Sequence, residues 1–106
     1  MPDYPKDPMP VVTAMQSYTP SLPELSEEVL EGVETALAAA ILQTSPVEKI
    51  VAAFNILGPH VAVLDLEGAQ ILAGAAELIT LHNFHGKNSE ALGVRDAAIA
   101  RLEALA

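Results

Sequence analysis

The chain has 106 residues, which suits a single domain with a modest hydrophobic core. Its 14 acidic and 5 basic residues give a formal net charge of −9, which opposes nonspecific binding to nucleic acid or to an anionic membrane. The absence of cysteine excludes disulfides, thiol catalysis and thiolate metal sites. The chain is 51% apolar but only 4% aromatic, and alanine-rich helices of this kind gain further burial by self-association.

Residues 1–20 differ in composition from the rest of the chain because they hold five of its eight prolines. Proline favours extended or polyproline backbone, so this segment is either a disordered leader or an extended arm. A flexible leader would usually carry fewer apolar and aromatic groups. We therefore predict an extended arm that lies over its own domain or a neighbouring subunit through Met9, Val11, Val12, Met15 and Tyr18.

The N-terminus shows no basic region followed by an apolar run, so the sequence predicts no signal peptide. A cytoplasmic location is the default expectation.

The first helix is predicted over residues 22–42. Ser21 and Glu24 have the spacing of a capping box, and apolar residues then recur every three or four positions. Glutamates fill the opposite arc and crowd toward the N-terminal half, where the helix dipole favours them. We interpret these glutamates as a solvated outer face rather than as a site for a basic partner.

A second helix is predicted over residues 46–57, since Ser45-Pro46-Val47-Glu48 is a strong helix start. Gly58-Pro59 is expected to end it with a left-handed cap. Ile56 lies nearly opposite the core-facing side chains and indicates a second contact surface.

The third predicted helix, residues 60–84, is apolar almost all the way round and is therefore expected at the centre of the fold. One stripe holds the small residues Ala69, Ala73 and Ala76, which would let another helix approach closely as an interaction seam. Residues 61–66 are β-branched enough for a short strand, but no partner strand is available. Four polar or charged residues inside this segment make a membrane span too costly.

Three polar residues in and just after this helix are candidates for a binding or metal site. Asp65, at the edge of the core face, needs a partner such as Lys49, Arg95 or a second subunit. His82 and His85 could share a metal, but no third ligand has suitable spacing, so they are expected to contact carbonyls at the helix end. We expect no catalytic residue, no metal and no cofactor.

The last helix is predicted over residues 89–105. Within it, Leu92-Gly93-Val94, Ala98-Ile99 and Leu102 resemble the turn and recognition helix of helix-turn-helix DNA-binding proteins. Residues 85–91 are similar to the start of that motif in Fis-type regulators. The resemblance implies a transcriptional regulator in which Arg95 and Arg101 face DNA, although Asp96 and Glu103 offset these two charges.

The sequence thus predicts an all-α protein: four helices packed like a small bundle around the third, with residues 21–106 as one domain. The favoured function is non-enzymatic, that of a helical subunit that binds to itself or to a larger protein assembly. The alternative is a DNA-binding regulator with a degenerate helix-turn-helix at residues 85–105. We do not expect nucleic acid or membrane as a partner under the favoured interpretation.

Overall fold

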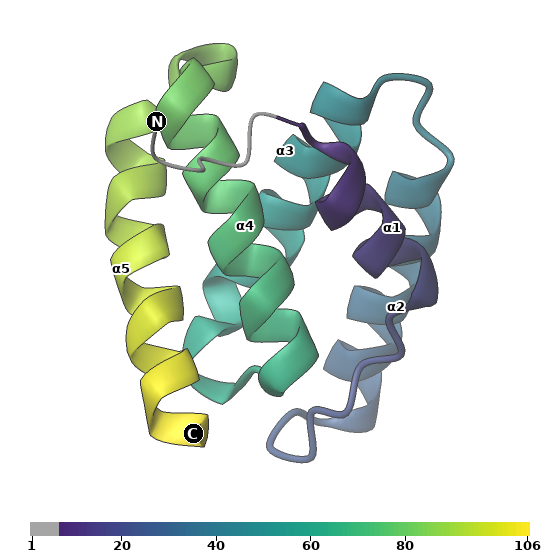
Figure 1. Cartoon of the computed structure of the whole chain (residues 1–106). Helices are drawn as coiled ribbons and strands as arrows, with labels where there is room; N and C mark the ends of the chain where they lie inside the picture. The colour runs from purple at the N-terminus through teal and green to yellow at the C-terminus, as the bar shows by residue number, and fades with distance from the viewer. Residues whose placement is uncertain (1–6) are drawn as a thin grey trace.

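The computed structural model describes residues 7–106, and within them the predicted all-α class is confirmed. This part of the chain forms five α-helices and two short 3₁₀ segments (Figure 1). In chain order these are α1 (Met9–Ser17), α2 (Glu27–Ile41), α3 (Pro46–Leu57), η1 (Gly58–Val63), α4 (Leu66–His82), η2 (Phe84–Gly86) and α5 (Asn88–Leu105).

The N-terminal segment is helical where we predicted an extended arm. Pro10 lies in the first turn of α1, where a helix tolerates proline because the first N–H groups have no intrahelical partner. Val11, Val12 and Met15 are buried in the same core as the later helices. The extended conformation is therefore wrong for residues 9–17, whereas residues 1–6 of the predicted arm lie outside the described residues.

α2 begins five residues later than predicted, at Glu27. The side chain of Ser26, rather than that of Ser21, caps it by accepting a hydrogen bond from the Val29 amide at 3.3 Å. Residues 22–25 form a turn in which the Leu25 amide donates to the Leu22 carbonyl, and Leu22 is buried. The predicted bounds of α3 are confirmed.

The start of the third predicted helix is wrong. Gly58 has right-handed helical angles instead of the expected left-handed cap, and the chain continues into η1. Leu64 and Asp65 are then extended, and α4 begins at Leu66 with Asp65 as its cap. Residues 61–63, for which the sequence left an α-helix or a short strand open, thus belong to the 3₁₀ segment η1.

α4 is the central helix, as predicted: α5 runs along one side of it, α1 lies on the other side, and α3 lies behind (Figure 1). Most of its apolar residues are buried. They are Ala69, Ile71, Leu72, Ala75, Ala76, Leu78 and Ile79. Because neighbours cover three sides of α4, its weakly amphipathic sequence is consistent with its position.

α4 and α5 form an antiparallel pair joined by a tight turn at η2 (Figure 1). Asn83 and His85 adopt left-handed backbone angles there, with φ of 51° and 55°. Within residues 7–106, these two helices pack against each other more extensively than any other pair. Ala69 and Ala76 of α4 and Ala91 and Ala98 of α5 have no exposed surface, so small side chains on both helices allow this close approach.

Candidate interaction surface

Asp65 joins three segments that are distant in the sequence. Its Oδ1 atom accepts hydrogen bonds from the Tyr18 hydroxyl at 2.7 Å and from the Gly68 amide at 2.9 Å. Its Oδ2 atom accepts from the Ser21 amide at 2.9 Å. The carboxylate therefore caps α4 and also holds the chain that leaves α1. The partners expected from the sequence, Lys49 or Arg95, are not the ones that the structure shows.

The Tyr18–Asp65 contact leaves little free space. A Cβ atom on Gly68 would lie 2.5 Å from the Tyr18 hydroxyl oxygen and 2.6 Å from Asp65 Oδ1. Burial and, secondarily, the hydrogen bond to the Asp65 carboxylate raise the pKa of Tyr18 well above its usual range. The hydroxyl is therefore held as a neutral donor, and we interpret this cluster as a structural latch for α1.

Arg95 and Arg101, which would face DNA in the helix-turn-helix alternative, both lie on α5. Arg101 donates a hydrogen bond from Nε to the Leu64 carbonyl at 2.8 Å, which ties α5 to the start of α4. Arg95 is only 27% exposed, and its Nη2 atom lies 3.6 Å from Asp96 Oδ1. Its buried Nε has no hydrogen-bond partner among residues 7–106. Leu92-Gly93-Val94, the expected turn, lies inside the continuous helix α5, so this feature of the resemblance is wrong.

The two histidine candidates for a metal do not converge. The His82 ring stacks on Phe84 with ring centroids 5.2 Å apart. His85 Nε2 lies 2.9 Å from Glu48 Oε1, in an exposed contact between η2 and α3. Among residues 7–106, no group of three or more histidine or carboxylate side chains is arranged to hold a metal.

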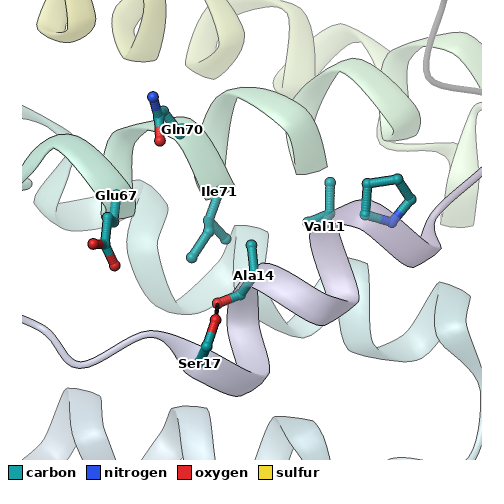
Figure 2. Close-up of a pocket in the computed structure, with 7 residues that line it drawn as sticks. Val11, Ala14, Ser17, Glu67, Gln70 and Ile71 are labelled. Atoms are coloured by element: carbon teal, nitrogen blue, oxygen red, sulfur yellow. Dashed lines mark hydrogen bonds between the residues drawn. The ribbon is translucent and has the colours of Figure 1, made fainter.

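A groove of about 560 Å³ lies between α1 and α4 (Figure 2). Val11 and Ala14 of α1 and Ile71 of α4 give it an apolar floor, while Glu67 and Gln70 lie along its α4 rim. The Ser17 hydroxyl, at one end, is already bonded to the carbonyls of Thr13 and Ala14. The polar groups at this groove are thus few and exposed.

Ile56, the predicted second contact residue, lines a shallower groove of about 290 Å³ between α2 and the α3–η1 segment. Val29 lies on the α2 side of this groove and is 41% exposed. Ile56 itself is partly buried against the core. Its side chain therefore lies at a surface, as expected, but within a small recess.

Four of the exposed large apolar side chains come from the neighbouring helices α4 and α5. Leu66 and Leu81 of α4 are 50% and 43% exposed, and Leu92 and Ile99 of α5 are 43% and 40% exposed. Leu92 and Ile99 are seven residues apart, so they lie on the same face of α5.

The direction of these side chains follows from the helix period of about 100° per residue. On α4, Gly74 faces α1, since a Cβ there would lie 2.8 Å from Val11 Cγ2. Ala69 and Ala76 are buried about 140–160° away from Gly74 around the helix. The arc between these two sides carries Leu66 and Leu81, with the polar side chains of Gln70 and Glu77 between them. On α5, Val94 lines a recess with Phe54 and Gly58 of the α3–η1 segment. Leu92 and Ile99 lie about 140–160° around α5 from Val94, so their arc faces away from α3, as the exposed arc of α4 does. We call Leu66, Leu81, Leu92 and Ile99 the α4–α5 apolar face.

Most of the interaction residues expected from the sequence are used within the chain. Val11, Val12, Met15, Ala69 and Ala76 are buried; Tyr18, Ile56 and Ala73 are partly buried, and Met9 is 48% exposed. The sequence reasoning missed the α4–α5 apolar face. The seven-residue spacing of Leu92 and Ile99 was a usable signal, but these two residues were interpreted from the sequence only as part of the helix-turn-helix resemblance.

Comparison with protein-family models, curated proteins and solved structures finds no significant match to this chain. Within residues 7–106, none of the helices combines the length and apolar character that crossing a membrane requires.

Proposed function

We propose that this protein is a non-enzymatic helical subunit that acts by associating with itself or with a larger protein assembly. The observation that carries the proposal is the α4–α5 apolar face. Four large aliphatic side chains from two adjacent helices, Leu66 and Leu81 of α4 and Leu92 and Ile99 of α5, are each 40–50% exposed. Scattered exposed leucines are ordinary on a protein surface, whereas several aliphatic side chains on the same side of two packed helices are typical of an interaction site.

The bonding of Asp65 supports a structural rather than a chemical role for its carboxylate. The sequence places Asp65 at the edge of the core-facing side of its helix, where a carboxylate needs a partner. Its oxygens accept three hydrogen bonds that fix α1 and the start of α4. A carboxylate bonded in this way stabilises the fold, and its substitution should affect stability first.

The experiment that tests the proposal is a native mass measurement of the protein at its natural expression level, with any co-purifying proteins identified. Association predicts a species larger than the 11.1 kDa monomer. A monomer under these conditions, confirmed by sedimentation of the purified protein up to high micromolar concentration, would contradict the proposal.

A parallel binding assay separates this proposal from the DNA-binding alternative. A DNA-binding protein is retained on heparin or mixed DNA and released by salt, because binding releases counterions. We expect passage without retention, since the net charge is −9 and Arg101 is already bonded to a backbone carbonyl. Salt-dependent retention would favour the regulator.

A further inference from the structure

From the α4–α5 apolar face we infer a specific occupant: a second copy of this chain, with α4 of each copy packed against α5 of the other. This inference rests on the proposed function and names its partner. Two antiparallel helix pairs that meet in this way form a four-helix arrangement with two-fold symmetry, in which the same surface serves both copies.

The distribution of charge favours this face for self-association. α2 presents Glu27, Glu28, Glu31 and Glu34 to solvent, on the far side of the molecule from α5 (Figure 1). The segment from Lys87 through α5 is balanced instead: it has three basic residues (Lys87, Arg95 and Arg101) and three acidic ones (Glu90, Asp96 and Glu103). Two copies that meet through α4 and α5 therefore keep their acidic α2 surfaces apart.

Two charged residues beside the α4–α5 apolar face favour one of the two possible arrangements of the copies. Glu77 is half-buried on the exposed arc of α4, and Arg95 lies on α5 between Leu92 and Ile99. If α4 met α4 of the second copy, the two Glu77 carboxylates would face each other. If α4 meets α5, Glu77 of each copy faces Arg95 of the other, which is the complementary arrangement.

The affinity should be moderate. Each aliphatic side chain of the face is already about half covered within its own chain, so dimerisation removes only the remaining half from water. We therefore expect a dimer that dissociates on dilution, in the range of weak or transient interfaces.

The first test uses sedimentation velocity on the full chain and matched variants. Ile99→Glu adds a charge to the α4–α5 apolar face, and Val29→Glu adds the same charge to an equally exposed position in the α2–α3 groove. We expect Ile99→Glu to raise the dimer dissociation constant by roughly 100-fold, because symmetry buries the new charge twice. Val29→Glu should leave it unchanged. Circular dichroism confirms that both variants are folded.

The second test exchanges the charges. Glu77→Arg and Arg95→Glu should each dissociate the dimer, because each places like charges opposite one another. Mixing the two variants should restore a dimer, since the arginines of one copy then face the glutamates of the other. Recovery on mixing cannot arise from an effect within one chain.

The outcomes separate this inference from the proposed function. A parent that stays monomeric at high concentration overturns the inference and also the self-association form of the proposed function. A dimer that Val29→Glu dissociates and Ile99→Glu does not overturns the inference only. A dimer sensitive to Ile99→Glu whose charge variants do not recover on mixing overturns the α4-to-α5 arrangement.

Discussion

Removing the Tyr18 hydroxyl tests the latch between α1 and α4. Tyr18→Phe keeps the ring in place but deletes the 2.7 Å hydrogen bond to Asp65 Oδ1. The Asp65 carboxylate keeps its two bonds to the Ser21 and Gly68 amides, so it does not become an unpaired charge. The substitution therefore isolates one hydrogen bond between segments 47 residues apart.

The expected cost follows from the type of bond. A hydrogen bond to a charged group contributes about 1.5–3 kcal/mol. The Tyr18–Asp65 bond is only partly buried, so we expect Tyr18→Phe to lower the free energy of unfolding by about 1–2 kcal/mol. Asp65→Ala removes all three bonds, including the cap of α4, and should cost about 2–4 kcal/mol.

The assay is urea unfolding of the parent, both single variants and the double variant, followed by circular dichroism. If the bond accounts for the effect, Tyr18→Phe should cost almost nothing once Asp65 is alanine, with a coupling of about 1 kcal/mol or more. A coupling energy near zero would contradict this prediction. It would mean that solvent stabilises the Tyr18 hydroxyl as much as the Asp65 carboxylate does.

Three further predictions concern pH and packing. The raised pKa of Tyr18 keeps it protonated in the fold, whereas an unfolded tyrosine ionises at about pH 10. The fold should therefore lose stability as pH rises above that value. Unfolding measured across a pH series should show a smaller loss for Tyr18→Phe than for the parent. Ala76→Leu forces bulk into the packed side of α4 and should cost about 1–3 kcal/mol or more in urea unfolding, while Ala100→Leu, at an exposed position of α5, costs little. Gly74→Ala places a Cβ 2.8 Å from a side-chain carbon of α1 and should lower the thermal midpoint, whereas Gly93→Ala meets nothing within 4 Å and should raise stability by about 0.5–1 kcal/mol.

Each of these predictions has a specific contradiction. If the parent and Tyr18→Phe lose the same amount of folding stability at alkaline pH, the loss arises from other titratable groups. Ala76→Leu with unchanged stability would mean that α4 and α5 are not held at close distance. Gly74→Ala as stable as Gly93→Ala would show that α1 shifts freely over α4.

The sequence was sufficient where the determinants are local. Ser45-Pro46 located the start of α3, since cap and proline signals depend only on neighbouring residues. The central position of α4 followed from its lack of a polar face. Asp65 was correctly identified as a carboxylate that needs a partner.

The sequence was insufficient where the outcome depends on contacts between distant segments. α1 is short and has two prolines at its start, and the burial of its apolar side chains against the other helices supports it. Nothing near Asp65 indicated that Tyr18 would be its donor. In the last helix, small and apolar residues occur all round, so only the position of α4 decides that Ala91 and Ala98 are buried and that Leu92 and Ile99 are exposed.

In the dimer inferred above, the side chains of Leu92 and Ile99 pack against a second copy of the chain. Isotope-filtered nuclear Overhauser spectra of an equal mixture of ¹³C-labelled and unlabelled protein measure this directly, because only contacts between molecules give signals. We expect intermolecular cross-peaks from the methyl groups of Leu92 and Ile99 to those of Leu66 and Leu81. Intermolecular cross-peaks confined to Val29 and Ile56, or none at a concentration where the protein is fully dimeric, would contradict it.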